Sequence, residues 1–200
     1  MILEYTSRQL LERLEAEPLT NKPDKKQKIL DLIDEKAFLP SEENKFDIIV
    51  GNISLQLTSD LKSILGRIYG LLEEDGVFLA AVIGEDSLFE LRKILSEIKH
   101  AGMPMTGMRE AGNILYQTGF KVPVTELEKV TVLYEDMFAL LRDLRTFGRC
   151  DVLYAENREH IGKQALCNAT RMYKERFSVS EDSKDYVKAS FDVIYLHGIK

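Results

Sequence analysis

Apolar and polar positions follow two different periods along the chain, which predicts strands and helices in turn. Residues 77–84 are a continuous apolar run, typical of a strand that is buried on both faces. Before it, residues 60–76 place apolar side chains at helical spacing and end in a glycine, which predicts a helix with a glycine stop. Residues 28–34 and 46–52 predict two further strands. Because strands and helices alternate, the pattern favours a parallel sheet in an α/β fold.

The N-terminal residues predict a strand that leads into a helix. Residues 1–5, MILEY, form a short apolar run, and residues 6–17 begin with Thr-Ser and repeat leucine at helical spacing. Residues 18–27 carry two prolines and several lysines, which is typical of a solvated connection. We therefore expect Glu4 near the carboxyl end of a strand and just before a helix.

The second half of the chain predicts four helices and two strands. The helices are expected at 86–102, 108–120, 135–148 and 156–177, and the strands at 121–134 and 190–200. Side chains alternate in the last strand, which fits an antiparallel pair at the edge of the sheet. The polar segment 178–185 predicts local mobility.

Length and composition narrow the class of protein. A chain of 200 residues with 44% hydrophobic side chains predicts one domain, residues 1–200. The net charge of −6 disfavours a nucleic-acid partner. No apolar run approaches the roughly 20 residues that span a bilayer, and no secretory pattern is present, so we expect a cytoplasmic protein without membrane insertion. Cys150 and Cys167 lack Cys-x-x-Cys spacing and the three histidines are scattered, so we expect buried free thiols and no metal site.

Several segments resemble the class I S-adenosylmethionine-dependent methyltransferases. They are "FDIIVGNISLQLTSDL", "LLEEDGVFLAAVIG" and "SLFELR", together with acids that follow the first two predicted strands. Within that group, "ISLQLTSDL", "GEDSLFELR" and "DVIYLHGIK" are most similar to the branch that holds the biotin-pathway malonyl-carrier-protein methyltransferase and the mitochondrial complex I assembly methyltransferase-like factor. The resemblance covers nearly the whole chain. It implies a three-layer, Rossmann-like α/β sheet with an antiparallel C-terminal strand.

Two acidic positions are candidates for binding the adenosine part of S-adenosylmethionine. A carboxylate at Glu4 could accept hydrogen bonds from both ribose hydroxyls, although an acid near a helix N-terminus is also favoured by the helix dipole alone. The resemblance places Glu35 against the adenine amino group, with the neighbouring Asp34 as a competing candidate. Lys36 would contribute its backbone amide.

The end of the strand at 46–52 is the candidate site for the methionine part of the cofactor or the incoming nucleophile. The resemblance implies this role for Asn52, Ser54 and Gln56; the alternative is that Asn52 caps a turn and Ser54 starts a helix. We expect Glu4, Glu35 and Asn52 to converge on one cleft. Farther on, Glu90 and Arg92 lie on one predicted helix. We expect them to form a surface pair with Glu97 or Asp86. The resemblance implies a substrate-side role as the alternative, and for Arg92 the surface pair is the better interpretation.

One feature of the methyltransferases is not found in these residues. The relatives begin with a strand and a glycine-rich turn, Asp-x-Gly-x-Gly-x-Gly, whereas the first glycine of this sequence is Gly51. We therefore expect an N-terminally truncated domain that lacks the first strand and the glycine-rich turn. We also expect weak or absent S-adenosylmethionine binding by this chain.

Two functions follow as alternatives. The first is an S-adenosylmethionine-dependent methyltransferase that acts on a small-molecule or carrier-protein substrate, mainly by positioning it. The second is a non-catalytic assembly or interaction factor that keeps the methyltransferase fold and binds a protein partner. Some members that resemble the complex I assembly branch are linked to arginine hydroxylation, so the resemblance leaves the reaction open.

Overall fold

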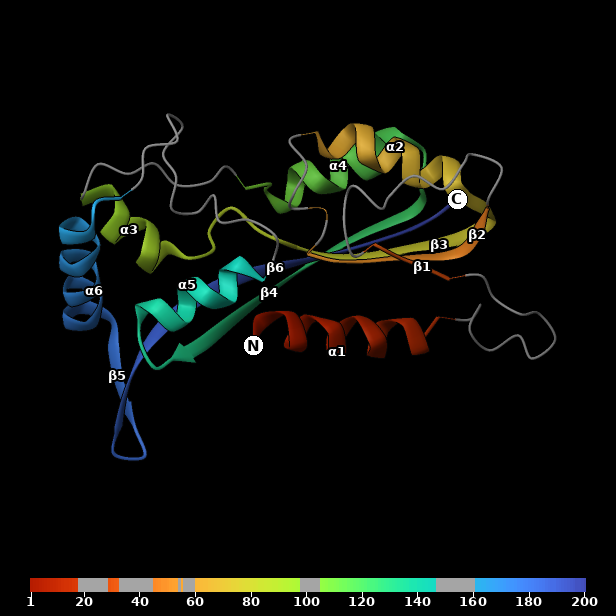
Figure 1. Ribbon diagram of the computed structural model, residues 1–200. Helices are drawn as coiled ribbons and strands as arrows, with labels where there is room; N and C mark the ends of the chain where they lie inside the picture. Colours follow the sequence, from red (N-terminus) through yellow and green to blue (C-terminus); the bar gives the residue numbers. More distant parts are fainter. Residues whose placement is uncertain (18–28, 33–44, 54, 56–59, 98–104, 147–160) are drawn as a thin grey trace. The chain divides into compact units, whose positions relative to one another are not determined.

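The computed structural model describes residues 1–17, 29–32, 45–53, 55, 60–97, 105–146 and 161–200. The chain forms two compact units, which we describe separately (Figure 1). The sheet unit comprises Ile2–Gly84, Thr106–Glu128 and Val193–Lys200. The helical unit comprises Met1, Glu85–Met105 and Lys129–Asp192. The expectation of one domain stays a prediction.

A mixed sheet forms the centre of the sheet unit. Its order is β1-β2-β3-β6-β4, with bounds Ile29–Leu32, Phe46–Asn52, Leu72–Ile83, Lys184–Ile199 and Lys121–Tyr134. β1 pairs with β2 and β2 with β3 in parallel, and β6 pairs with β3 in the antiparallel sense. The antiparallel C-terminal strand is thus confirmed. Its predicted place at an edge is wrong, because β6 lies between β3 and β4 and is buried along most of its length.

Helices cover both faces of this sheet. α2, Leu61–Leu71, and α4, Met108–Thr118, lie on one face, and α1, Ile2–Glu15, lies on the other (Figure 1). The core between the sheet and α2 and α4 is built from large apolar side chains of both layers. It includes Phe46, Ile49, Ile64, Leu65, Ile68, Phe78, Val82, Leu115, Phe120, Ile194 and Leu196.

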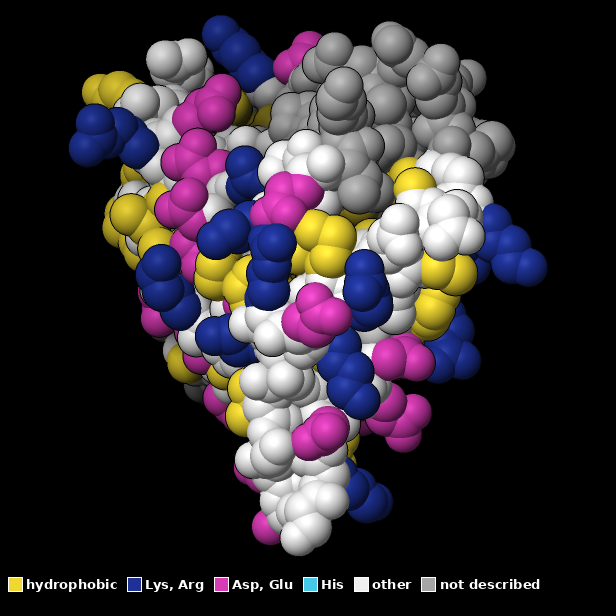
Figure 2. Space-filling model, turned by 90° about the vertical axis from the view of Figure 1, so that its left-hand side faces the viewer, with side chains coloured by type: hydrophobic (Ala, Val, Ile, Leu, Met, Phe, Trp, Pro, Cys, Tyr) yellow, Lys and Arg dark blue, Asp and Glu magenta, His cyan; other side chains and the backbone are white. Residues whose placement is uncertain are grey.

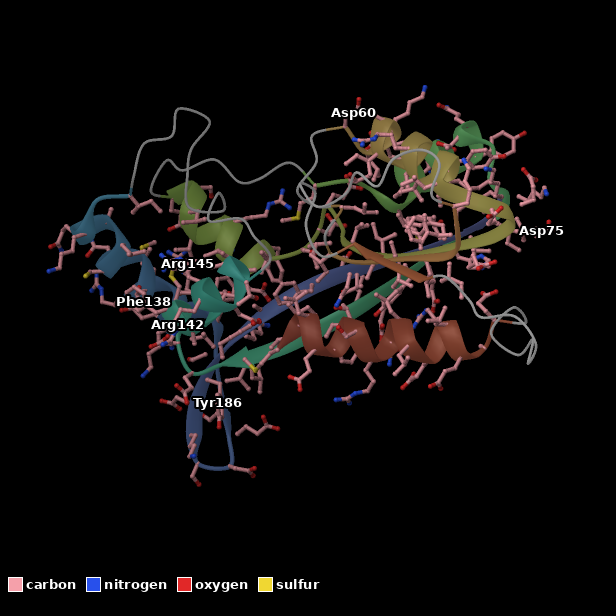
Figure 3. The ribbon with its side chains drawn as sticks, turned by 45° about the vertical axis from the view of Figure 1, so that its right-hand side comes forward. Asp60, Asp75, Phe138, Arg142, Arg145 and Tyr186 are labelled. Carbon is pink, nitrogen blue, oxygen red and sulfur yellow. The ribbon has the colours of Figure 1, made fainter. Side chains whose placement is uncertain are left out.

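Local sequence explains where these two helices begin and end. Asp60 precedes α2 (Figure 3), and its carboxylate accepts a hydrogen bond from the Ser63 amide at 3.0 Å, which satisfies one of the free donors of the first turn. α4 ends at Gly119, whose φ of 104° is the left-handed conformation that glycine adopts at little cost. The helix expected at 108–120 therefore ends at the residue before this glycine.

The predicted extent of the helix at 60–76 is wrong. α2 ends at Leu71, and β3 begins at Leu72. The pairing with β2 shifts register here, so that Glu73, Glu74 and Asp75 form an exposed irregularity in the strand. Gly76 permits this irregularity, because a Cβ there would lie 2.8 Å from the Glu73 carbonyl oxygen. The glycine therefore marks a close backbone approach and not a helix stop.

The predicted strand at residues 1–5 is also wrong. The helix α1 already begins at Ile2, and Glu4 lies exposed in its first turn. Ile2, Thr6 and Leu10 of α1 are buried, whereas Glu4 and Arg8 between them are exposed. A strand would place all five side chains on one face, so this pattern is helical. β2 takes β1 as its neighbour on one side and β3 on the other.

Within the described residues, the helical unit contains three helices and a hairpin. α3, Phe89–Glu97, α5, Met137–Arg145, and α6, Lys163–Phe177, are followed by β5, Ser178–Glu181, which pairs with the start of β6. The segment predicted to be mobile, residues 178–185, thus forms an antiparallel hairpin. Cys167 is free but exposed, contrary to the expected buried thiol, and Cys150 lies outside the described residues. The exposed side of α5 carries Phe138, Arg142 and Arg145 (Figure 3).

Charges of both signs are mixed over the described part of the face in Figure 2. Ion pairs of the helical unit are consistent with this mixture: Arg176 with Glu97, Arg171 with Glu175, and Lys174 with Asp185. Within the described ranges, none of the helices is long and apolar enough to cross a membrane. The same residues contain no group of three or more His, Cys, Asp or Glu side chains placed to hold a metal ion.

Candidate functional site

The carboxyl end of β2 is the candidate site, because ligands of open α/β sheets bind where parallel strands end. β2 ends at Asn52, which pairs with Ala81 of β3. The next residue, Ile53, donates its amide to the Ala81 carbonyl at 2.8 Å and is almost fully buried. Its φ of 59° is unusual for a β-branched residue, so the surrounding structure holds the backbone in a strained turn at the end of the strand.

The Asn52 carboxamide is bonded entirely to α1. Its Nδ2 donates to the Leu3 carbonyl at 3.0 Å and to Ser7 Oγ at 2.7 Å. Its Oδ1 accepts from Thr6 Oγ1, also at 2.7 Å. Both N–H donors of the amide and its oxygen are therefore in use, and the buried Thr6 fixes the first turn of α1 over the end of β2. The Asn52 side chain thus attaches α1 to the end of β2.

Polar contacts continue along α1 toward β4 and β6. Glu128 of β4 accepts hydrogen bonds from two tyrosine hydroxyls, Tyr5 of α1 and Tyr195 of β6. Arg13 places its guanidinium 3.8 Å from the centre of the Tyr195 ring and pairs with Glu126 at 2.9 Å. We call these five residues the polar layer. The polar layer joins α1 to the sheet. Water could replace its hydrogen bonds.

The polar layer raises the pKa of both tyrosines. The hydrogen bond to Glu128 raises the pKa of Tyr5 above its ordinary value, because ionising the hydroxyl would place two negative charges together. Burial, followed by the charge of Glu128, raises the pKa of Tyr195. Both hydroxyls therefore act as hydrogen-bond donors at neutral pH and are poorly suited to act as bases.

The structure tests only part of the predicted site. Glu4 lies on α1, the same helix that binds Asn52, but in an exposed position of the first turn. The other predicted residues lie outside the described residues: Glu35, Lys36, Ser54 and Gln56, as does Asp34. The predicted cleft shared by Glu4, Glu35 and Asn52 therefore stays a prediction.

Sequence reasoning missed the partners that surround Asn52. The sequence indicates only a helix start at Thr6 and Ser7, and it does not single out Glu128. Local patterns carry no signal for these contacts, because Thr6 and Asn52 are 46 positions apart and Tyr5 and Glu128 are 123 apart. The Thr-Ser pair at residues 6–7 is the hint that the sequence offers, and of the two only Thr6 is buried.

The predicted surface pair at Glu90 is wrong. Glu90 is completely buried in the helical unit, where its carboxylate accepts from the Ser190 hydroxyl at 2.7 Å and the Ser190 amide at 3.0 Å. Arg92 donates instead to the Glu85 carbonyl oxygen. Glu90 therefore fastens the first turn of α3 to β6, as Ser87 does through its bonds with the Asp192 backbone.

A separate groove of about 610 Å³ lies within the helical unit. Met137, Thr170 and Val187 supply uncharged lining, and charged side chains of both signs surround them. Its charged residues are Glu135, Asp136, Arg171, Lys174 and Glu175. Asp136 already caps α5 by accepting from the Ala139 amide at 2.7 Å. Because acidic and basic side chains both line the groove, its charge favours neither an anionic nor a cationic ligand.

Comparison with curated proteins finds two groups of relatives. The chain is 34% identical over 165 residues to "Arginine-hydroxylase NDUFAF5, mitochondrial" of Dictyostelium discoideum, covering 78% of this chain and 37% of that protein. It is 30% identical over 213 residues to the protein of the same name from Danio rerio, covering 100% and 65%. It is 28% identical over 165 residues to the "Malonyl-[acyl-carrier protein] O-methyltransferase" of Nitrosospira multiformis, covering 81% and 52%. The chain thus spans between 37% and 65% of these relatives' lengths.

Comparison with solved structures supports the fold. A candidate methyltransferase from Bacillus halodurans superposes with a TM-score of 0.50 at 14% identity, covering 81% of this chain and 67% of that chain. At this identity the likeness concerns the fold alone. No protein-family model matches the chain.

Proposed function

We propose, from its class I S-adenosylmethionine-dependent methyltransferase fold and its homology to NDUFAF5 and malonyl-carrier-protein methyltransferases, that this protein works as a methyltransferase of that group. The observation that carries the proposal is the alignment with the Nitrosospira multiformis methyltransferase, which covers 81% of this chain. The substrate we propose is a small molecule or a carrier-borne acyl group, by analogy with the Nitrosospira multiformis relative. The Dictyostelium discoideum relative is named an arginine-hydroxylase, so arginine hydroxylation is the competing reaction.

The described residues, in the arrangement observed, do not fit S-adenosylmethionine. Asn52 would have to bind the cofactor with a carboxamide whose donors and acceptor are all bonded to α1. Glu4 lies in a helical turn and not at the end of a strand, where a carboxylate meets the ribose hydroxyls. We therefore derive no catalytic step through the cofactor.

From this arrangement we predict that the 200-residue chain binds S-adenosylmethionine weakly. Hydrogen bonds to a ligand contribute about 1 to 3 kcal/mol each when charged or buried groups are involved. Losing two or three of them weakens binding by several powers of ten. Calorimetric titration of the purified chain with S-adenosylhomocysteine should give no heat of binding at micromolar concentrations.

Two further chains make this titration decisive. A version lengthened at its N-terminus by a strand and a glycine-rich turn should regain binding, because such a turn supplies backbone N–H groups to the ligand. In that version, a tenfold loss of binding by Glu4→Ala but not by Glu12→Ala would place Glu4 at the ligand, whereas equal, small effects of both variants would show that Glu4 keeps the exposed helical position observed here. Tight binding by the unmodified chain, abolished by Glu4→Ala, would show that the cofactor site is already complete.

The non-catalytic interaction factor remains the second candidate, and one observation favours it. The end of β2, where a ligand of this fold would lie, is occupied by the chain's own helix α1. A protein that serves only as a binding partner needs no access to that position. If the lengthened chain also fails to bind S-adenosylhomocysteine, this second function is the better one.

A further inference from the structure

The exposed face of α5 carries one aromatic and two basic side chains (Figure 3). Phe138, Arg142 and Arg145 follow one another at spacings of four and three residues, so they form a single stripe along the helix. We call these three residues the α5 stripe. The opposite face of α5 consists of buried apolar side chains: Met137, Leu140, Leu141 and Leu144. That face holds α5 in the helical unit and leaves the stripe available for a partner.

Within the described part of the chain, the two arginines of the α5 stripe have no carboxylate partner. Other arginines of the helical unit differ in this respect, because Arg171 pairs with Glu175 and Arg176 pairs with Glu97. The acid of α5 itself, Asp143, is only 13% exposed and lies on another side of the helix, about 100° from Arg142. The stripe therefore presents two positive charges that the described residues do not neutralise.

The helix dipole explains only part of this arrangement. Basic side chains are favoured in the last turn of a helix, and Arg142 and Arg145 both lie there. The dipole gives no reason for Phe138 in the first turn, where its side chain is 43% exposed. Aromatic residues and arginine are the types enriched at protein interfaces, whereas lysine is depleted there. The composition of the stripe thus favours an interaction surface.

The charges indicate which kind of partner fits the stripe. A guanidinium binds carboxylates and phosphates through parallel N–H donors. A nucleic acid requires many cations at once, and the net charge of −6 on this chain disfavours it. Two arginines beside one aromatic ring match a smaller target, namely a protein surface with two carboxylates and an apolar side chain.

We propose that the α5 stripe docks an acidic protein surface, that of the carrier protein whose acyl group the proposed function acts on. Arg142 and Arg145 are three positions apart on the helix, so carboxylates one helical turn apart on the partner meet both guanidinium groups. Phe138, at the other end of the stripe, covers an apolar side chain of the partner. The identity of the partner as a carrier protein rests on the proposed function, whereas the acidic character of the docked surface does not.

Fluorescence anisotropy measures this docking, with a labelled malonyl-acyl-carrier protein of net negative charge as the probe and the 200-residue chain as the titrant. Binding should be detectable at micromolar chain concentrations and should weaken about tenfold when NaCl rises from about 50 to about 300 mM. Arg142→Ala and Arg145→Ala should each weaken binding about tenfold, and Arg142→Glu should abolish it. Absence of binding by the unmodified chain refutes the docking surface.

Matched variants separate the stripe from general charge and exposure. Lys163→Glu makes the same change of charge as Arg142→Glu at an exposed position in the first turn of α6, and it should leave the affinity unchanged. Phe138→Ala should weaken binding about tenfold at both salt concentrations, whereas Tyr116→Ala, at a 75% exposed position of the sheet unit, should not. Equal effects of Lys163→Glu and Arg142→Glu would refute the proposal, because the attraction would then be unspecific.

Two further measurements distinguish other outcomes. Sedimentation with vesicles of anionic phospholipid tests a membrane surface, and binding to vesicles that needs Arg142, without binding to the carrier protein, overturns the proposal. Titration of the N-terminally lengthened chain with S-adenosylhomocysteine tests the proposed function separately. Docking through the stripe without cofactor binding supports the docking surface and counts against the proposed function. Cofactor binding without docking through the stripe refutes the docking surface alone.

Discussion

Two tyrosines keep their hydroxyl groups inside the helical unit. Tyr134 donates to Asp143 at 2.6 Å, and Tyr173 donates to the Lys188 carbonyl at 2.9 Å. Burial is the main cause that raises the pKa of both, and the neighbouring carboxylates, Asp143 and Glu90 respectively, raise it further. The tyrosinate form is therefore strongly disfavoured in the folded chain.

The higher pKa of these two tyrosines in the folded chain than in the unfolded chain predicts a loss of stability in alkali. An unfolded tyrosine has a pKa of about 10, so above that pH the folded state holds more protons than the unfolded state. The stabilisation is complete below pH ~10 and is lost as the pH rises toward the folded pKa values. Urea denaturation at a series of pH values should show the free energy of unfolding falling above pH ~10. Tyr134→Phe should make this fall shallower, whereas Tyr116→Phe, at a 75% exposed position, should leave it unchanged.

Residue types alone did not predict what Asn52 and Glu90 do. Asn52 was expected to face a ligand or cap a turn, and Glu90 was expected to form a surface ion pair. Glu90 instead bonds to Ser190, 100 positions away, and Asn52 to the start of α1. Partners at such separations are brought together only by the sheet, so no local pattern could identify them.

For individual helices and strands, prediction succeeded where the hydrophobic pattern extends over many residues and failed where it extends over few. The strand expected at 121–134 coincides with β4, and the strand at 46–52 with β2. The five residues MILEY are too few to show a period, and in the structure Ile2 begins a buried stripe that continues at Thr6 and Leu10 of the helix. The end of α2 was misjudged because Gly76 serves a strand irregularity.

The glycines of α2 and β6 make a paired prediction. Gly66 lies in the exposed interior of α2, and a Cβ added there would meet no atom within 4 Å, so Gly66→Ala should raise the free energy of unfolding by about 1 kcal/mol. A methyl group at Gly198 would lie 2.7 Å from the Phe120 ring, so Gly198→Ala should lower it by about 1 to 3 kcal/mol. Urea denaturation of the two variants measures both changes. Equal effects would contradict the packing of Phe120 on β6.

On the scale of the whole molecule, composition and alternation predicted the α/β class and the antiparallel last strand. They could not predict two compact units, because the boundary passes through the middle of β4 and β6 rather than through a linker. A polar linker leaves a signal in the sequence, whereas a strand that continues from one unit into the next leaves none.

These continuous strands predict how the chain unfolds. β4 and β6 each contribute residues to both units, so each unit holds part of a strand that the other unit continues. We therefore expect a single cooperative transition, with the calorimetric enthalpy equal to the van't Hoff enthalpy. Two resolved transitions in scanning calorimetry would show that the units are energetically independent.

The position of β6 also bears on the synthesis of the protein. It is the latest of the described strands to leave the ribosome, yet it lies between β3 and β4, which were made earlier. Until β6 is inserted, β3 lacks its neighbour on that side, and its apolar residues Val77–Ile83 present open backbone groups to other nascent chains. The interval between translating β3 and translating β6 is therefore the period in which this protein most needs a chaperone.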